Sequence, residues 1–285
     1  MTKVVSETRS FGGVQGVYEH ASAATGTPMT FAAFVPEHEA GEKLPVLFYL
    51  SGLTCTHANV MEKGEYRAAC AKHRIILVAP DTSPRGPDFD GNDVPDAADE
   101  YDFGLGAGFY VNATQGEWSQ HYRMRSYIED ELPKVVAELL PAADLRRQAI
   151  TGHSMGGHGA LTIALRNPGR FASVSAFSPI VAPSQVPWGQ KALGRYLSED
   201  QAAWSEYDTV SLIEGGARVD HILVDQGSAD NFLEEQLKTH LLVEACEQAG
   251  INANIRMQEG YDHSYFFIAT FMEDHIAWHA GHLAA

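Results

Sequence analysis

The chain has 285 residues, 45% of them apolar and 20% charged, a balance that is ordinary for a soluble globular protein with a sizeable core. Its formal net charge of −17, from 20 basic and 37 acidic residues, disfavours nucleic acids and anionic membranes as partners. Three widely separated cysteines exclude a disulfide framework and a zinc ribbon, and no stretch reaches the roughly 20 apolar residues of a membrane span. Because the first residues also lack the apolar core of a signal peptide, we expect a cytoplasmic protein.

Short apolar runs along the chain are typical of β-strands. Residues 29–36 are expected to add an antiparallel strand at one edge of a sheet. Five later runs are rich in Val, Ile and Leu without strict alternation, which is the pattern of strands covered on both faces in a parallel sheet. These runs are residues 45–52, 74–81, 147–154, 172–179 and 221–230.

Segments with apolar residues near helical spacing alternate with these runs. Pro168 is expected to end the second segment, and Gly250 to cap the C-terminus of the third. The alternation favours one α/β domain over residues 1–285, with a mostly parallel central sheet and helices on both faces. Residues 81–112, rich in Gly and Pro, are expected to form a long loop of the kind that is often functional. The helical segments are residues 119–140, 156–168, 232–250 and 264–283.

The motif GHSMG, residues 152–156, places Ser154 where a buried strand ends and a helix begins. In a G-x-S-x-G turn the serine occupies a strained corner, and the glycines leave room for neighbouring backbone. The turn also puts the hydroxyl at a helix N-terminus, where backbone N–H groups favour developing negative charge. The context predicts that Ser154 is a nucleophile; the alternative is a glycine-rich turn that holds an idle serine.

An activated serine needs a base and an orienting acid, which follow it in the chain order Ser, Asp or Glu, His. His263 precedes the last helix, the place expected for the base; a structural histidine at a helix start is the alternative. Asp230 and Asp225 are both candidates for the acid. We favour Asp230, because it follows the C-terminal end of a predicted strand, at the same sheet edge as Ser154. Asp225 lies within that strand or just at its end, where it would cap or pair structurally.

Acyl transfer also needs two N–H donors for the oxyanion of its tetrahedral intermediate. One is expected at Met155, directly after the nucleophile. The other is expected at Leu53, where Gly52 lets the chain turn sharply after a strand. A tight turn without a catalytic role is the alternative for this loop.

Three other features weigh less as functional sites. The run GLGAG, residues 104–108, has the wrong spacing for a dinucleotide-binding loop. His275 and His279 have the i, i+4 spacing of zinc ligands but lack the glutamate of H-E-x-x-H, so we expect surface or packing histidines and no metal. Cys55, beside the Leu53 loop, is either a reactive thiol or a small buried residue.

Six segments together resemble the S-formylglutathione hydrolases, also known as the esterase D family. The resemblance runs from the N-terminal strands to the last helix, and it implies an α/β-hydrolase fold without metal or organic cofactor. The implied activity is hydrolysis of the small-molecule substrate S-formylglutathione to glutathione and formate in formaldehyde detoxification, with carboxylesterase side activity. The implied protein is a cytoplasmic homodimer. The segments are SGLTCTHANV, PDTSPRG, YDFGLGAGFYVNAT, GHSMGGHGAL, VDQGSADNF and GYDHSYFFIATF.

The resemblance also implies a role for individual residues. It implies that a cysteine at the position of Cys55 can make the enzyme sensitive to thiol reagents. The family's nucleophile, acid and base fall on Ser154, Asp230 and His263, and its oxyanion donors fall on Leu53 and Met155.

Trp188, in the segment PWG, offers a hypothesis on selectivity. A formyl group carries only hydrogen on its carbonyl, so a narrow acyl pocket would select it, and Trp188 is a candidate for narrowing that pocket. A tryptophan of the core or of a subunit interface is the alternative. A general short-chain carboxylesterase and an acyltransferase remain alternative functions. A non-catalytic scaffold is disfavoured, because all three triad positions are filled.

Overall fold

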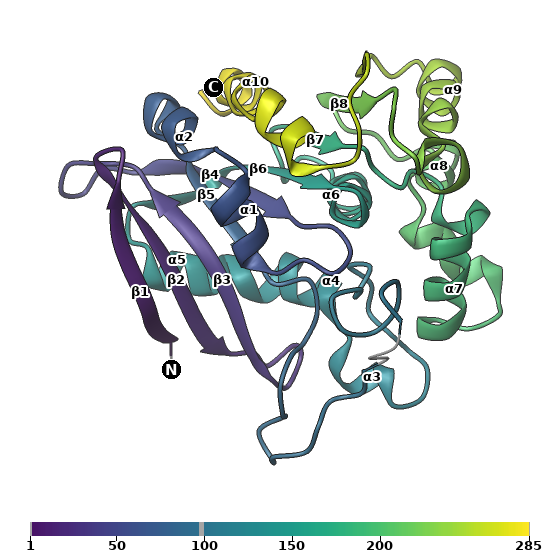
Figure 1. The fold of residues 1–285 in the computed structure, drawn as a ribbon, viewed down its shortest axis with the longest axis horizontal. Helices are drawn as coiled ribbons and strands as arrows, with labels where there is room; N and C mark the ends of the chain where they lie inside the picture. Colours follow the sequence, from purple (N-terminus) through teal and green to yellow (C-terminus); the bar gives the residue numbers. More distant parts are fainter. Residues whose placement is uncertain (1, 97–99, 285) are drawn as a thin grey trace.

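In a computed structural model, which describes residues 2–96 and 100–284, nine strands join in one twisted sheet (Figure 1). Their order across the sheet is β1-β2-β3-β5-β4-β6-β7-β8-β9. Pairs from β1 through β3 to β5 are antiparallel, and all pairs from β5 to β9 are parallel. The strands are β1 (Thr2–Ser10), β2 (Gly13–Ala21), β3 (Pro28–Val35), β4 (Leu44–Leu50), β5 (Ile76–Pro80), β6 (Ala143–His153), β7 (Val174–Phe177), β8 (Ile222–Gly227) and β9 (Asn254–Gln258).

The five strands predicted from apolar runs, β4 to β8, are confirmed, although their ends differ by a few residues. Every residue of β4, β5, β7 and β8 is buried, which explains why their sequences show no alternation. The antiparallel strand expected at residues 29–36 is β3. The sequence did not predict β1, because this edge strand is exposed along almost its whole length and therefore lacks an apolar run.

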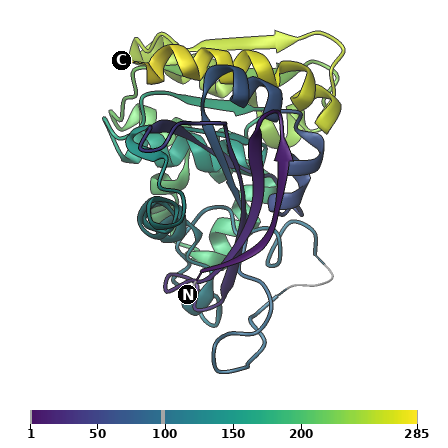
Figure 2. The same cartoon turned by 90° about the vertical axis from the view of Figure 1, so that its left-hand side faces the viewer.

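Helices cover both faces of the sheet, as predicted (Figures 1 and 2). Side chains of β4 point alternately into the two cores, so Val46 and Phe48 join one core and Leu47 and Tyr49 the other. On one face lie α1 (His57–Lys63), α2 (Arg67–His73) and α10 (Tyr265–Leu283). On the opposite face lie α5 (Leu132–Leu139), α6 (Met155–Arg166), α8 (Thr209–Glu214) and α9 (Thr239–Ala249).

The prediction of one continuous helix over residues 119–140 is wrong. The chain leaves helical conformation at Tyr122, where ψ is 69°. Further on, Pro133 has no N–H to donate to the carbonyl of Glu129 four residues earlier, and that carbonyl accepts from Arg170 instead. The pieces of this segment are α3 (Trp118–His121), α4 (Met124–Ser126), a π-helical turn (Tyr127–Glu131) and α5.

The predicted ends of two helices are confirmed. The helix α6 stops before Pro168, and Gly250 caps α9 with a left-handed φ of 67°. The segment that leads into α9 is broken at Lys238, whose φ of 50° separates a π-helical turn from α9. Residues 81–112 form the expected long loop as far as they are described; residues 97–99 lie outside the described part.

His275 and His279 lie on the buried side of α10 and contact polar groups of the sheet. Nδ1 of His275 lies 2.8 Å from the Ser175 hydroxyl, and its Nε2 lies 3.1 Å from Asp225 Oδ2. The ring nitrogens of His279 lie 2.7 and 2.8 Å from the hydroxyls of Ser173 and Ser175. The pair therefore has a packing role. Across the described ranges, no group of three or more His, Cys, Asp and Glu side chains is placed to hold a metal ion.

None of the helices within residues 2–96 and 100–284 is both long enough and apolar enough to cross a lipid bilayer.

Lowering the pH from 7 to 5 is expected to destabilise the protein, because His158 is buried in its neutral form. Its Nε2 lies 3.0 Å from the carbonyl oxygen of Phe109, and burial lowers its pKa to about 4. In the unfolded chain a histidine has a pKa of about 6.5, so the unfolded chain binds this proton at a higher pH than the folded chain. The free energy of unfolding is then expected to fall by up to about 1.4 kcal/mol per pH unit for this residue.

Urea unfolding at pH 7, 6 and 5 measures this slope. His158→Gln is expected to reduce the slope, while the same change at the exposed His240 is expected to leave it unchanged. Equal slopes in the wild type and in His158→Gln would contradict the assignment of the acid sensitivity to His158.

Candidate active site

Ser154 occupies the sharp turn between β6 and α6, where the sequence predicted it. Its φ of 57° and ψ of −118° are unusual for a residue with a Cβ, and such strain costs about 1–3 kcal/mol. Hydrogen bonds hold the strained residue in place: its amide donates to the Phe177 carbonyl at 2.9 Å, and its carbonyl accepts from the His158 amide at 3.0 Å. The turn fixes Ser154 at the N-terminus of α6.

Two glycines make this turn possible. A Cβ on Gly156 would lie 1.9 Å from the carbonyl oxygen of Leu50, and a Cβ on Gly152 would lie 2.2 Å from the carbonyl oxygen of Gly156. These neighbours are backbone atoms of the sheet and of the turn itself, so they cannot move aside as a flexible side chain can. The prediction that these glycines leave room for neighbouring backbone is confirmed.

His263 and Asp230 form a close pair. Asp230 Oδ2 lies 2.6 Å from Nδ1 of His263, and Asp230 Oδ1 accepts from the Phe232 amide at 2.9 Å. Burial raises the pKa of the Asp230 carboxyl. The hydrogen bond and charge of His263 lower this pKa by more than burial raises it, so the pKa lies below its usual value. A carboxylate in this position holds Nδ1 of His263 as a donor and leaves Nε2 for proton exchange.

Asp225, the competing acid, has other partners. It lies in β8 and accepts from Nε and Nη2 of Arg256 at 2.7 and 2.5 Å and from Gln258 at 3.0 Å. Burial raises the pKa of this carboxyl, but His275 and Arg256 lower it far more, to well below its usual range. The fold therefore brings Asp230 to His263 and holds Asp225 in a partly buried ion pair with Arg256.

A cavity of about 210 Å³ brings most of the predicted site residues together. Met155, which directly follows Ser154, is not among the residues that line it. Asp230 lies behind His263 and also stays outside the lining. The lining residues are Gly52, Leu53, Thr54, Cys55, Tyr101, His153, Ser154, Trp188, Phe232 and His263.

The Leu53 loop lies directly against the turn of Ser154. A Cβ on Gly52 would be 3.2 Å from the Cβ of Ser154. The two amides that follow Leu53 are already engaged, since Thr54 donates to Gly106 at 2.9 Å and Cys55 donates to Gly52 at 3.3 Å. The loop is therefore adjacent to the nucleophile, as an oxyanion donor requires. The role of the Leu53 amide stays a prediction.

Comparison with known proteins places this chain in a family. Residues 22–278 match the family model described as "Putative esterase". The structure of an S-formylglutathione hydrolase from Agrobacterium tumefaciens is 53% identical and superposes with a TM-score of 0.95, over 98% of this chain and 99% of that chain. The chain belongs to the S-formylglutathione hydrolase family. It is a serine hydrolase with an α/β-hydrolase fold, as the sequence motifs predicted.

Two more distant structures share the fold of this serine hydrolase. The substrate-bound fluorophosphonate-binding serine hydrolase FphF from Staphylococcus aureus is 17% identical, with a TM-score of 0.73 over 94% of this chain and 98% of that chain. A ferulic acid esterase is 18% identical, with a TM-score of 0.72 over 99% of both chains. At these identities the likeness concerns the fold alone.

Four residues that line the cavity of this family member were not identified from the sequence: Thr54, Tyr101, His153 and Phe232. All four lie in segments that carried the family resemblance, which was the available signal. The ring centroid of His153 lies 4.5 Å from that of His263. Burial, together with the charge of His263, lowers the pKa of His153 well below its usual value. His153 is therefore a neutral neighbour of the proposed base.

Cys55 is a buried thiol at the edge of the hydrolase cavity. It is 9% exposed, and burial raises the pKa of its thiol above the usual value. A neutral thiol is a weaker nucleophile than a thiolate, so the raised pKa lowers the reactivity of Cys55. The geometry favours the small buried residue over the reactive thiol.

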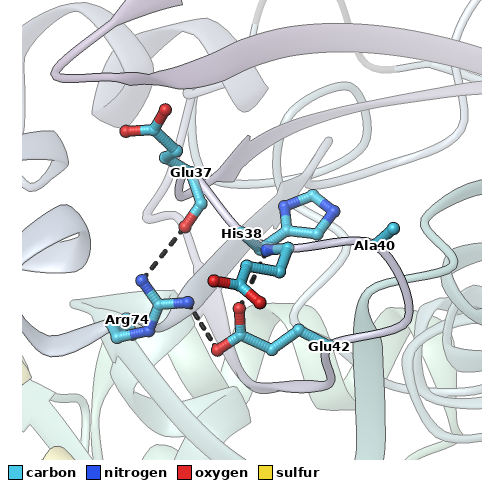
Figure 3. Close-up of a pocket in the computed structure, with 6 residues that line it drawn as sticks. Glu37, His38, Ala40, Glu42 and Arg74 are labelled. Carbon is cyan, nitrogen blue, oxygen red and sulfur yellow. Dashed lines mark hydrogen bonds and ion pairs between the residues drawn. The ribbon is translucent and has the colours of Figure 1, made fainter.

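A larger cavity, of about 770 Å³, lies at the opposite edge of the hydrolase's sheet, near the N-terminal ends of β4 and β5 (Figure 3). There the Arg74 guanidinium bridges the carbonyl oxygen of Glu37 at 3.1 Å and the carboxylate of Glu42 at 2.5 Å. His38 and Ala40 complete this side of the cavity. Arg74 and Glu42 pair with each other, and no serine or cysteine is among the described residues that line this cavity, so it is not a second candidate for acyl transfer.

Proposed function

We propose that the protein hydrolyses S-formylglutathione to glutathione and formate and thereby acts in formaldehyde detoxification. The observation that carries the proposal is the His263–Asp230 pair beside Ser154 in a small cavity. The 53% identity to an S-formylglutathione hydrolase over almost the whole chain supports the choice of substrate.

In the proposed reaction the Ser154 hydroxyl oxygen attacks the thioester carbonyl, and Nε2 of His263 takes its proton. The carbon–sulfur bond then breaks, and the leaving sulfur takes that proton from His263, so that the formyl group remains as an ester on Ser154. Water next gives a proton to His263 and attacks the ester, which releases formate and restores the serine. Asp230 keeps the imidazole in the required tautomer and stabilises its positive form.

We assign the oxyanion of both tetrahedral intermediates to the amides of Leu53 and Met155. The Leu53 loop contacts the Ser154 turn, and Met155 begins α6, where N–H groups have no partner within the helix. Losing one such donor typically costs about 10²–10³ in rate.

Trp188 at the start of α7 (Pro187–Tyr196) is proposed to narrow the acyl side of the cavity. It lines the cavity and is only 5% exposed, so it also packs as a core residue. Trp188→Ala is expected to raise kcat/KM for p-nitrophenyl butyrate relative to acetate by about tenfold, because removing a wall admits longer chains. An unchanged preference among formyl, acetyl and butyryl esters would remove Trp188 from selectivity.

The proposed activity is tested by comparing kcat/KM on S-formylglutathione, followed by thioester absorbance, with kcat/KM on p-nitrophenyl acetate. We expect a thioester preference of at least about 100-fold, and loss of both activities in Ser154→Ala. Equal or faster turnover of the plain ester would replace the proposal with a general short-chain carboxylesterase.

One observation favours the carboxylesterase as a side activity or as the alternative. Among the described residues that line the cavity there is no Lys or Arg, so the cavity itself offers no cationic side chain to the carboxylates of glutathione. An acyltransferase would use the same triad and would show itself by faster acyl release when an alcohol is added to the assay. We further propose one domain over residues 1–285 and a cytoplasmic homodimer without cofactor, on the family resemblance alone.

A further inference from the structure

A cluster of four charged side chains joins the long loop to α7 beside the cavity. Lys191 Nζ lies 2.5 Å from Glu100 Oε2 and 2.6 Å from Asp102 Oδ1, and Arg195 Nη1 lies 2.8 Å from Glu100 Oε1. Each of these side chains is between about one seventh and two fifths exposed, so solvent and salt reach the pairs. We call Glu100, Asp102, Lys191 and Arg195 the ion cluster.

The residues that follow in the loop are also anchored to α7. The Phe103 ring stacks on Tyr196 with centroids 4.4 Å apart, and the Arg195 guanidinium lies 3.7 Å over the Phe103 ring. The Gly104 amide donates to the Tyr196 hydroxyl at 3.0 Å. The backbone on both sides of Tyr101 is therefore held against one helix.

Between these anchors, Tyr101 completes a row of aromatic rings that leads to the proposed base. Trp188 Nε1 donates to the Tyr101 hydroxyl at 3.0 Å, and the two rings meet edge to face with centroids 6.2 Å apart. The ring centroids of Trp188 and Phe232 lie 4.7 Å apart, and those of Phe232 and His263 lie 5.1 Å apart. All four residues line the cavity.

We propose that Tyr101, held in place by the ion cluster, is a specificity-determining residue that limits the size of the acyl group. The inference rests on the proposed function, because it assigns the cavity wall of Tyr101, Trp188 and Phe232 to the acyl chain. Tyr101 is 59% exposed, so little packing of its own holds the ring. Its place depends on the hydrogen bond from Trp188 and on the charged neighbours on either side.

The hydroxyl of Tyr101 also fixes Trp188. An indole N–H in an apolar wall needs an acceptor, and Tyr101 supplies it. Without that acceptor Trp188 gains by turning toward water, which widens the cavity. Tyr101 therefore acts on the acyl group twice, through its own ring and through the orientation of Trp188.

The test compares kcat/KM for p-nitrophenyl acetate, butyrate and hexanoate. Tyr101→Ala is expected to raise the butyrate-to-acetate ratio about tenfold, and Tyr101→Phe, which keeps the ring but removes the acceptor, about threefold. The change is expected mainly in KM for the longer esters, with a thermal unfolding midpoint close to that of the wild type. Ratios within a factor of 1.5 of the wild type in both variants would overturn the proposal.

A second measurement tests the ion cluster. Raising the ionic strength from about 0.05 M to about 1 M screens partly exposed ion pairs, so the wild-type butyrate-to-acetate ratio is expected to rise. Lys191→Met is expected to show the raised ratio already at low salt and to lose the salt dependence. Lys72→Met removes an exposed ion pair between Lys72 of α2 and Glu273 of α10. This variant is the matched control and is expected to behave like the wild type.

The outcomes separate this inference from the proposed function. A salt dependence that persists unchanged in Lys191→Met would overturn the role of the ion cluster. Ester hydrolysis that survives in Ser154→Ala would instead overturn the nucleophile and the proposed function. If the protein did not hydrolyse S-formylglutathione but still hydrolysed the p-nitrophenyl esters, the proposed function would fail. The butyrate-to-acetate ratios could then still be measured, so the role of Tyr101 would be tested on its own.

Discussion

Asp230→Asn is expected to lower kcat by about 10⁴ while the protein stays folded. The amide oxygen can still accept from the Phe232 backbone, but the amide nitrogen cannot accept from Nδ1 of His263. The imidazole then takes the other tautomer, with its proton on Nε2, and cannot remove the proton of Ser154. Gln226 donates to the same Asp230 oxygen at 3.2 Å, so two donors would face each other, which costs about 1–2 kcal/mol of stability.

Asp225→Asn is the matched control, because both aspartates belong to the same strand and the loop that follows it. It removes a buried carboxylate that pairs with Arg256 and contacts His275. We expect a loss of about 2–4 kcal/mol in the free energy of unfolding, with kcat of the folded enzyme within about threefold of the wild type. Steady-state kinetics and urea unfolding of both variants measure the contrast. A drop in kcat as large in Asp225→Asn as in Asp230→Asn would contradict the assignment of the acid.

These two aspartates also show which features of the site could be predicted from the sequence. The predicted strand placed Asp230 at the same sheet edge as Ser154, the chain order indicated His263 as the base, and the structure brings the side chains of Asp230 and His263 to 2.6 Å. The sequence could not say what Asp225 contacts, because its partners Arg256 and His275 lie on later elements. The parallel strands were readable because burial on both faces leaves continuous apolar runs.

The cavity wall was harder to predict for a different reason. Tyr101 reaches Trp188 because the described part of the 81–112 loop, which holds no helix or strand, folds back on α7, and no local pattern encodes that path. The pairing depends on long-range contacts such as Lys191 with Asp102. The family resemblance identifies such a segment as typical of the family. The folded structure is needed to show which of its side chains faces the cavity.

Gly156→Ala is expected to destabilise the fold strongly, because the added methyl group would collide with backbone atoms. The new Cβ would meet the carbonyl oxygens of Leu50 at 1.9 Å and of Ser51 at 2.6 Å. Both belong to the end of the central strand β4 and to the loop that carries Leu53, so relief requires α6 to move away from the sheet. We expect a loss of about 4 kcal/mol or more in the free energy of unfolding, and a displaced Ser154 in any protein that still folds.

Gly281→Ala provides the comparison for this change. Gly281 lies in the last turn of α10, and a Cβ there would meet nothing within 4 Å. Adding a methyl group to an unobstructed helix position is expected to leave activity unchanged and to stabilise the protein by up to about 1 kcal/mol, since alanine favours helix over glycine. Urea unfolding measures the stability of both variants. It distinguishes the cost of a collision with the backbone from the effect of replacing a flexible glycine by alanine. If Gly156→Ala were as stable as Gly281→Ala, the close approach of α6 to β4 would not be what requires glycine in the nucleophile turn.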